Sequence, residues 1–245
     1  MTAKLNPQDQ ALNIASPAGF DAQAVPIHEV CIDQPKVADH ALDPLSLRSR
    51  FQSPPVWQPE ITDESRHVVA TNIISKRQAA GKVTRAAVLI PLLLKSEGLS
   101  VLLTQRTDHL HDHAGQISFP GGRMDEGDSD PNDTALRESE EEIGLSRQSV
   151  EIIGHLPQYL TVSGYSVTPV VGLVKPQAEY VLDAFEVADV FEVPLHFLMD
   201  PANHQVRVWN SEQGGRRFYS MPHENRFIWG ATAGMLRNLY HLLKV

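Results

Sequence analysis

The feature that most constrains this chain is a helix signal with glutamates at fixed spacing between residues 134 and 143. Glu138, Glu141 and Glu142 are spaced i, i+3 and i+4, so they share one face of a helix, while Glu140 points away from it and is expected at the surface. The other side of the helix has to pack against the protein, and it carries Leu136, Ser139 and Ile143. The pattern therefore predicts an amphipathic helix over 134–143.

The segments on either side set the limits of this helix. Asp133 is placed to cap the first turn, and Gly144 is a natural helix stop. Upstream, "QISFPGG" (116–122) predicts a short strand that ends in a Pro-Gly-Gly turn. An acidic loop joins that turn to the helix, so the acidic residues follow directly on a strand.

The acidic face predicts a bound divalent cation. Carboxylates on one helix face repel one another by roughly a few tenths of a kcal/mol per exposed pair, and Mg²⁺ and Mn²⁺ prefer oxygen ligands of this kind. Arg137 lies one turn before Glu141 and can hold its carboxylate, while Gly121 and Gly122 let the backbone approach a ligand. The alternative is a solvated helix face. The order of strand, turn, acidic loop and helix favours the metal site.

Composition excludes several classes of protein. The 245 residues carry a net charge of -9, which argues against broad nucleic-acid binding because phosphate backbones need a basic face. The single cysteine, Cys31, excludes a disulfide framework and favours a reducing compartment. No stretch approaches the roughly 18 apolar residues of a membrane span, and the first residues do not resemble a secretory signal. These observations predict a cytoplasmic protein that binds neither nucleic acid nor membrane.

The chain divides near residue 80. Residues 1–80 are rich in proline and lack a clean hydrophobic period, which predicts an irregular N-terminal extension. Such an extension either wraps the main body or helps to pair two subunits in a homodimer. Short helices are expected within it at 43–52 and 62–81, and residues 81–245 form the predicted main domain.

Strands dominate the main domain. Apolar runs predict a hairpin of 85–94 with 99–106, strands at 150–157 and 167–174, a strand leading into a short helix over 189–200, and a second hairpin around "SEQGG" (211–215). A helix with one apolar stripe is expected over 226–245. Helices are few and interspersed, so the predicted fold class is α/β (α+β), with a mixed sheet packed between helices.

The acidic segment resembles the Nudix box, which in that family is G-x5-E-x7-R-E-U-x-E-E-x-G-U, where U is a bulky aliphatic residue. The chain agrees at Gly122, Arg137, Glu138, Glu141, Glu142, Gly144 and Leu145. It departs from the motif in having Asp128 in place of the loop glutamate, one additional residue before Arg137, and Ser139 where an aliphatic residue is usual. The metal-binding half is intact, and the sequence leaves the role of Asp128 open.

The resemblance implies a fold and a chemistry. Nudix domains are α/β/α sandwiches with a mixed sheet, and they hydrolyse a nucleoside diphosphate linked to another group, using water and divalent metal. By resemblance, Glu138, Glu141 and Glu142 would bind Mg²⁺ or Mn²⁺ together with the carbonyl of Gly122. Glu138 or Glu142 would help to deprotonate the attacking water, and Arg137 would orient a glutamate.

The sequence before the box resembles one branch of the family. "LLTQRTDHLHDHAGQISFPGG" (102–122) is similar to the motif of coenzyme A pyrophosphatases, and "WGATA" (229–233) also looks like that branch. The resemblance implies hydrolysis of coenzyme A, or its acyl or oxidised forms, to 4′-phosphopantetheine and adenosine 3′,5′-bisphosphate. It also implies substrate contacts from Arg106, His111, Gly115 and Phe119. The alternatives are a Nudix enzyme for another substrate, such as ADP-ribose, and a Nudix module that binds its ligand without catalysis.

Other interpretations of single features stay open on the sequence. Arg106 can bind a phosphate with two hydrogen bonds, or it can form a salt bridge at a strand end. The motif "HLHDH" (109–113) is more simply a set of loop contacts than a zinc site, and "WGATA" is more simply helix packing. The family also implies one more acidic ligand from a distant loop, for which Glu186 is preferred among Glu179, Asp183, Glu186 and Asp189.

Overall fold

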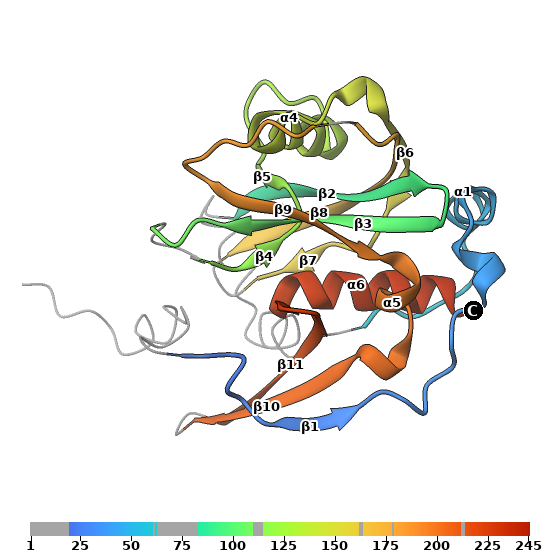
Figure 1. Cartoon of the computed structure of the whole chain (residues 1–245), viewed down its shortest axis with the longest axis vertical. Coiled ribbons are helices and arrows are strands. Elements are labelled where there is room, and N and C mark those ends of the chain that lie inside the picture. The colour runs from blue at the N-terminus through green and yellow to red at the C-terminus, as the bar shows by residue number, and fades with distance from the viewer. Residues whose placement is uncertain are drawn as a thin grey trace, which may run out of the picture.

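The computed structural model describes residues 20–60, 62, 83–109, 115–161, 164–177, 179–211 and 214–245. Figure 1 shows stacked layers, with helix α4 (Pro131–Ile143) on one face of a large sheet, helix α6 (Gly230–Leu243) on the other, and a smaller sheet beyond α6. The predicted mixed sheet between helices is therefore confirmed, and the smaller sheet adds a layer. None of the helices in these ranges is long and apolar enough to cross a membrane.

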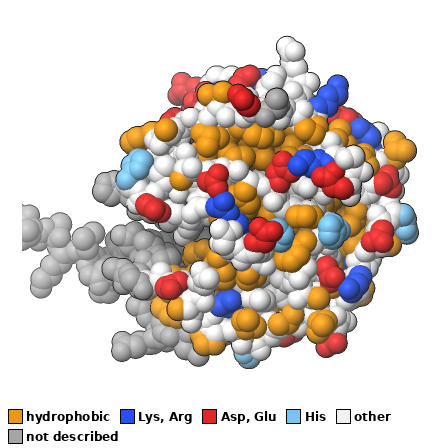
Figure 2. Space-filling model, viewed as in Figure 1, with side chains coloured by type: hydrophobic (Ala, Val, Ile, Leu, Met, Phe, Trp, Pro, Cys, Tyr) orange, Lys and Arg blue, Asp and Glu red, His pale blue; other side chains and the backbone are white. Residues whose placement is uncertain are grey.

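Strand β2 (Thr84–Lys95) is the centre of the large sheet. It pairs in parallel with β8 (Tyr165–Val174) and antiparallel with β3 (Gly98–Arg106). Its side chains alternate between the two faces, with Ile90 in the core toward α6 and Leu89 in the core toward α4. A strand that is apolar on both faces needs a cover on each, which explains the two helical layers. In the same view, Figure 2 shows hydrophobic side chains gathered below α4, at the level of this sandwich.

The rest of the large sheet extends from these central strands. Its order is β4-β3-β2-β8-β6, while β5 pairs with β2, β7 with β8 and β9 with β3. The bounds are β4 Ile117–Ser118, β5 Gly121–Arg123, β6 Val150–His155, β7 Tyr159–Leu160 and β9 Val187–Pro194. The first predicted hairpin and the strands near 150 and 167 are confirmed. β9 continues into the short helix α5 (Leu195–Leu198), also as predicted. Short 3-10 turns follow α4 and α5, namely η3 (Arg147–Ser149) and η4 (Pro201–Asn203).

The smaller sheet is antiparallel, in the order β1-β10-β11-β12. Its strands are β1 (Ile27–Val30), β10 (Gln205–Ser211), β11 (Gly214–His223) and β12 (Arg226–Trp229), and the predicted hairpin around "SEQGG" is confirmed as β10–β11. The prediction of one helix over 226–245 was wrong at its start, because 226–229 pairs with β11 and α6 begins at Gly230. Gly230 has a φ of 64°, which breaks the extended run, and an apolar stretch as short as "RFIW" does not distinguish a strand from a helical turn.

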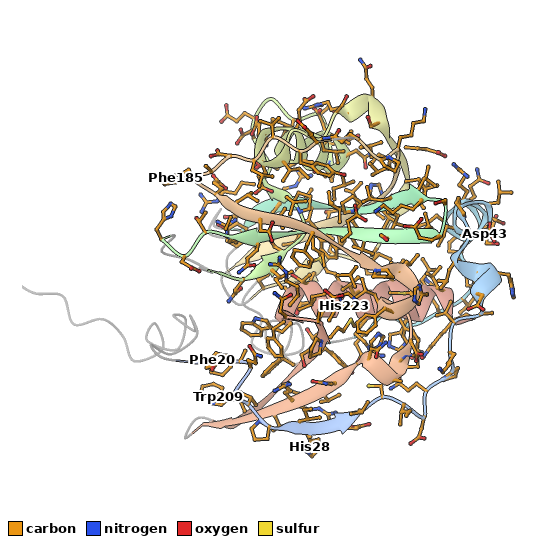
Figure 3. The ribbon with its side chains drawn as sticks, viewed as in Figure 1. Phe20, His28, Asp43, Phe185, Trp209 and His223 are labelled. Atoms are coloured by element: carbon orange, nitrogen blue, oxygen red, sulfur yellow. The ribbon has the colours of Figure 1, made fainter. Side chains whose placement is uncertain are left out.

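Residues 20–60 wrap the main body, as the extension was predicted to do. At one end the ring of Phe20 packs on the smaller sheet, with ring centroids 5.1 Å from Trp209 and 5.9 Å from Trp229, and Figure 3 shows it beside Trp209. At the other end η2 (Asp39–Leu42) leads to α1 (Pro44–Gln52), which matches the helix predicted at 43–52 and buries Leu47 completely. Of the helix predicted at 62–81 only Thr62 is described, the domain boundary near residue 80 lies outside the described residues, and the homodimer stays a prediction.

A buried arginine joins the extension to helix α6. The side chain of Arg237 is 1% exposed, and the rings of Tyr219 and Tyr240 lie on it, each with its centroid 4.8 Å from the guanidinium carbon. The guanidinium donates at 2.9–3.0 Å to acceptors on three other segments, which are His204 Nδ1, Gln34 Oε1 and Glu60 Oε2. Its charge is therefore offset by an anion and two aromatic faces, as a buried charge requires.

His204 is held in its neutral form by this network. Its Nε2 lies 2.7 Å from the carbonyl oxygen of Leu198 and donates to it, while Nδ1 accepts from Arg237 at 3.0 Å. A second proton, on Nδ1, would face the arginine cation. Burial first, and the charge of Arg237 in addition, lower the pKa of His204 from 6.5 to about 4.

We expect the free energy of unfolding to decrease as the pH falls from 6.5 toward about 4. In the unfolded chain His204 takes up a proton near pH 6.5, whereas in the folded chain it does so only near pH 4. The contribution of neutral His204 to stability is therefore complete above pH 6.5 and is lost progressively as the pH falls from 6.5 toward about 4. The effect is on the order of 3 kcal/mol. Urea unfolding of the wild type and His204→Gln across this range measures it. His204→Gln should show a shallower pH dependence, whereas the exposed-site control His28→Gln should match the wild type; equal pH dependence in all three proteins would contradict the assignment.

Candidate active site

Helix α4 begins earlier than predicted. The N-cap is Asp130 rather than Asp133, because Asp130 Oδ1 accepts a hydrogen bond from the Asp133 N–H at 2.9 Å. Asp133 instead accepts from the N–H of Ser129 at 3.2 Å. Pro131 follows the cap and suits the first helical position, which is the signal that decides between the two aspartates. The helix ends at Gly144 with a φ of 66°, as predicted.

The side of α4 that faces the sheet carries small residues. Ala135 and Ser139 are fully buried, and Ser139 Oγ donates to the Ala135 carbonyl at 2.6 Å. The serine in a usually aliphatic position is therefore satisfied inside the helix. The glutamates lie beside this face with graded exposure: Glu142 is 6% exposed, and the side chains of Glu138 and Glu141 are 19% and 60% exposed. Glu140 is exposed, as predicted.

The glycine pair before the acidic loop belongs to a strand, which corrects the predicted turn. Gly121 and Gly122 pair with Val88 and Ala87 of β2 as part of β5. A Cβ at Gly122 would lie 2.5 Å from Cδ of Glu138 and 2.6 Å from each carboxylate oxygen. The carboxylate of Glu138 therefore fills the space that any side chain at position 122 would need.

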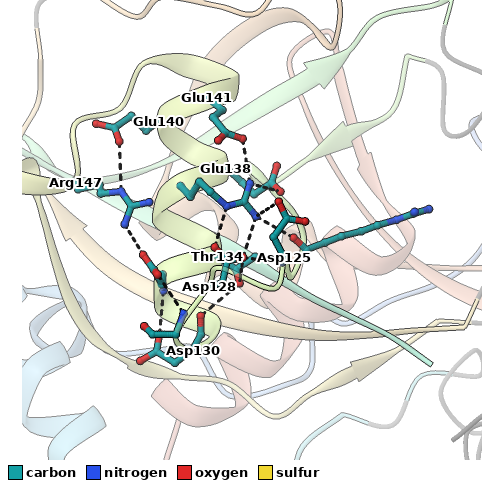
Figure 4. Close-up of polar contacts among 12 residues, drawn as sticks. Asp125, Asp128, Asp130, Thr134, Glu138, Glu140, Glu141 and Arg147 are labelled. Atoms are coloured by element: carbon teal, nitrogen blue, oxygen red, sulfur yellow. Dashed lines mark hydrogen bonds and ion pairs between the residues drawn. The ribbon is translucent and has the colours of Figure 1, made fainter. Parts of the chain in front are cut away.

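Arg137 connects the acidic loop with the glutamates of the helix (Figure 4). Its Nε and Nη2 donate to the two oxygens of Asp128, each at 2.9 Å. Its Nη1 lies 2.9 Å from Glu138 Oε1 and 3.0 Å from Glu141 Oε2. Nη2 also donates to the carbonyl of Arg123 at 3.0 Å. One planar guanidinium thus holds two helix carboxylates in fixed positions, which is the geometry that the predicted orienting role requires.

Asp128, whose role the sequence left open, is the main partner of Arg137. Its side chain is 3% exposed and also accepts from Thr134 Oγ1 and from the Asp125 N–H, each at 2.9 Å. The Arg137 guanidinium above all holds the pKa of the Asp128 carboxyl well below its usual range. Asp128 is shorter than the glutamate of the Nudix box, and one additional residue separates it from Arg137. The loop nevertheless keeps its contact with the helix through this pair.

The two less exposed glutamates bind protons more tightly than usual. Burial raises the pKa of Glu142 to about 8, although the Gly121 N–H donates to its Oε2 at 3.1 Å. Burial also raises the pKa of Glu138, against the opposing charge of Arg137. Adjacent carboxylates whose charged forms are disfavoured mark a position that a bound cation would stabilise.

The donor atoms fit a hard divalent cation. Glu138 and Glu142 supply carboxylate oxygens, and the missing side chain at Gly122 brings the β5 backbone close to them. Glu141, the third predicted ligand, is more exposed and contacts Arg137. In the described part of the chain, no group of three or more acidic, histidine or cysteine side chains is arranged so that it could hold a metal ion by itself.

Arg106 and Glu186 lie near the same glutamates. After burial, the charges that affect the pKa of Glu142 include those of Arg106 and Glu186, and Glu186 also raises the pKa of Glu138. Within the described residues, the Arg106 side chain has no hydrogen-bond or ion-pair partner, so the alternative of a strand-end salt bridge finds no support there.

The other candidates for the distant acidic ligand are engaged elsewhere or exposed. Asp183 Oδ1 accepts from the Phe185 N–H at 2.8 Å, and Asp189 forms an ion pair with Arg226. Glu179 is exposed. Among the four carboxylates, Glu186 is the one whose charge contributes to raising the pKa of Glu138 and of Glu142, and its role as the distant ligand stays a prediction.

The other three residues predicted to contact the substrate differ in their surroundings. Gly115 has a φ of 67°, and a Cβ there would lie 2.8 Å from Asp108 Oδ1, so the position needs glycine. The ring of Phe119 is 2% exposed in the main core, which replaces the predicted substrate contact by a packing role. His111 lies outside the described residues, and so does most of the "HLHDH" motif.

The packing interpretation of "WGATA" is confirmed. Thr232 Oγ1 donates to the carbonyl of Ile117 at 2.9 Å, and Ala233 is fully buried. A Cβ at Gly234, the next residue, would lie 2.8 Å from the ring of Tyr159. The start of α6 thus packs closely against β4 and the Tyr159 ring, and only small residues permit contacts this close.

Comparison with known proteins shows the family of this chain. The NUDIX domain profile matches residues 83–214, which is more than half of the chain. The chain belongs to the NUDIX family. Its curated relatives include proteins from Yersinia pestis and Yersinia pseudotuberculosis described as "Uncharacterized Nudix hydrolase NudL". They are 43% identical over 155 residues, which cover 63% of this chain and 77% of theirs. The chain is therefore a Nudix hydrolase, a class that acts on nucleoside diphosphate derivatives and generally uses divalent metal ions.

Solved structures show a more distant likeness. The Ap4A hydrolase of C. elegans, in a binary complex, has a TM-score of 0.41 at 21% identity, over 49% of this chain and 86% of that one. A MutT/nudix family protein from Enterococcus faecalis has a TM-score of 0.41 at 16% identity, over 82% and 73%. The NUDIX domain of Shewanella oneidensis NrtR, complexed with ADP ribose, has a TM-score of 0.37 at 22% identity, over 46% and 73%. The family assignment rests on the sequence match.

We expect Gly122→Ala to abolish most hydrolysis without unfolding the protein. The added Cβ would overlap the carboxylate of Glu138, which is the flexible end of a side chain and can move away at little cost to the fold. Loss of that carboxylate from its place should lower the rate at least about tenfold. Gly127→Ala is the matched control, since a Cβ there meets nothing within 4 Å. Thermal melting and metal-dependent hydrolysis rates test this, and full activity of Gly122→Ala would contradict the placement of Glu138.

Proposed function

We propose that this Nudix hydrolase cleaves the pyrophosphate of coenzyme A, or of its acyl or oxidised forms, to 4′-phosphopantetheine and adenosine 3′,5′-bisphosphate. The observation that supports this most is Arg106, at the end of β3. Its side chain has no partner within the described residues, it lies near the buried Glu142, and it belongs to the segment similar to coenzyme A pyrophosphatases. The single free Cys31 suits a reducing cytoplasm.

Arg106 is suited to bind the substrate pyrophosphate. A guanidinium presents paired N–H donors to phosphate oxygens, and one without a protein partner loses no ion pair when the substrate arrives. Coenzyme A carries a 3′-phosphate beyond its pyrophosphate, and His111 is the second group proposed to bind substrate. Because histidine changes charge near neutral pH, its contribution would vary with pH in a way that arginine's does not.

The proposed ligands of Mg²⁺ or Mn²⁺ are Glu138, Glu141, Glu142 and the Gly122 carbonyl, with Glu186 from the loop just before β9. When bound, such an ion neutralises charge on the phosphate oxygens and makes water a better nucleophile.

Glu138 or Glu142 would accept the proton of the attacking water. Arg137 keeps Glu138 in place, while the Gly121 N–H engages Oε2 of Glu142. The water oxygen bonds to one phosphorus, the bond from that phosphorus to the bridging oxygen breaks, and the two phosphate monoesters 4′-phosphopantetheine and adenosine 3′,5′-bisphosphate are released.

One observation favours a second substrate. The coenzyme A motif has an arginine where this chain has His111, so fewer permanent cations precede the box. That favours a nucleoside diphosphate sugar without the extra phosphate, such as ADP-ribose. Activity assays with Mg²⁺ or Mn²⁺ on both compounds decide between them. Faster release of AMP from ADP-ribose than of the bisphosphate from coenzyme A would overturn the proposal, and turnover of neither compound would support the non-catalytic alternative.

We expect Glu142→Gln to reduce kcat by about 100-fold or more, because the amide removes a charged metal ligand while keeping the shape of the side chain. Glu140→Gln is the matched control two residues earlier on the same helix, where the exposed side chain contacts Arg147 instead of the site. Circular dichroism should show both variants folded. An active Glu142→Gln would contradict the role given to this residue.

A further inference from the structure

Phe185 is an aromatic side chain that the fold leaves in solvent. The residue is 63% exposed, and among the described residues it is the one phenylalanine, tyrosine or tryptophan that is largely exposed. It lies in the loop before β9, and Figure 3 shows it at the outer end of that loop, directed away from the body. Burying a phenylalanine typically contributes about 1.5–3 kcal/mol, so this position forgoes a gain that the other aromatic residues obtain.

The exposed ring is held in place. The Phe185 N–H donates to Asp183 Oδ1 at 2.8 Å, and its carbonyl accepts from Thr107 Oγ1 at 2.8 Å. The His109 ring stands edge-on to it, with the ring centroids 4.9 Å apart and the planes at 61°. The hydrogen bonds hold the backbone of Phe185 on both sides, and the His109 ring supports its side chain. The loop therefore presents a flat aromatic surface in a defined position.

This surface borders the active site. The Asp183 N–H, two residues before Phe185, donates to the carbonyl of Glu142 at 2.9 Å. The carbonyl of Glu186, the residue after Phe185, accepts from the Thr107 N–H at 3.0 Å. On the neighbouring strand, Thr107, which binds the Phe185 carbonyl, directly follows Arg106. Phe185 thus lies beside the residues proposed to bind metal and pyrophosphate, on the rim where the group attached to the pyrophosphate would extend.

We propose that Phe185, braced by His109, stacks on the purine base of the nucleotide half of the substrate. The proposal rests on the function given above, in which that half is adenosine 3′,5′-bisphosphate. A flat ring with an open face matches a flat base, and such stacking contributes about 1–3 kcal/mol per base. The rim is also acidic, through Asp183 and Glu186. The Asp183 carboxylate repels phosphates but accepts a hydrogen bond from the exocyclic amine of adenine, while Glu186 is assigned to the metal ion. The rim therefore favours the base over the charged end of the nucleotide.

Calorimetric titration of each product separately tests the assignment. Phe185→Ala should raise the Kd of adenosine 3′,5′-bisphosphate about tenfold, and Phe185→Trp should restore it, because either aromatic ring can stack. The Kd of 4′-phosphopantetheine, which has no base, should not change. Val181→Ala is the matched control, since Val181 is 75% exposed in the same segment. An unchanged Kd for the bisphosphate in Phe185→Ala, or equal weakening of both products, would overturn the proposal.

Turnover separates this proposal from the function on which it rests. If coenzyme A is cleaved, Phe185→Ala should raise KM with little effect on kcat, because stacking takes place away from the reacting phosphorus. If ADP-ribose is the substrate instead, the coenzyme A proposal fails. The products to titrate are then AMP and ribose 5-phosphate, and Phe185→Ala should weaken binding of AMP, which has a base, but not of ribose 5-phosphate. Coenzyme A turnover with an unchanged KM in Phe185→Ala would leave the function standing and overturn the stacking.

Discussion

The constraint on which the rest depends is that strand β2 is apolar on both faces. Side chains at alternate positions enter two separate cores, so the strand is stable only with a layer on each side. Helix α4 forms one of these layers, and β5 pairs directly with β2. The glycines of β5 and the glutamates of α4 are therefore brought together by the same strand, which makes the position of the site a result of core packing.

The site combines strong hydrogen bonds from Arg137 with two glutamates whose charged forms are disfavoured. Arg137 ties loop and helix through hydrogen bonds to charged groups, which are the stronger class in proteins. Beside it, Glu138 and Glu142 lose contact with water, and their charged forms become less favourable. A functional cation site has this form, because carboxylates that were fully paired inside the protein would have little to gain from a metal ion.

Features that depend on local pattern and spacing could be predicted from the sequence. Features that depend on contacts between distant segments could not. The i, i+3, i+4 glutamates identified the helix and its partner Arg137 because that geometry is internal to one segment. The sequence around the glycine pair predicts a turn, whereas the structure shows a strand, because its pairing with Ala87 and Val88 depends on a strand more than thirty residues away. The bond between Asp128 and Arg137 crosses an irregular loop whose shape no period encodes. The Arg237 network joins residues 177 and 203 positions apart, and nothing near any of its members in the sequence indicates the others.

The same separation affects the order in which the protein can be assembled. During synthesis, residues 34 and 60 are made long before Arg237, so the extension has no buried cation to receive it when it emerges. Closing such long loops is entropically costly, and contacts of high sequence separation slow folding. Until α6 packs against the large sheet, the extension cannot form its hydrogen bonds with Arg237, and the apolar face that α6 covers stays exposed. The nascent chain thus passes through a stage in which Gln34 and Glu60 have been made but the arginine that they bind has not, and incompletely packed chains of this kind are prone to aggregate.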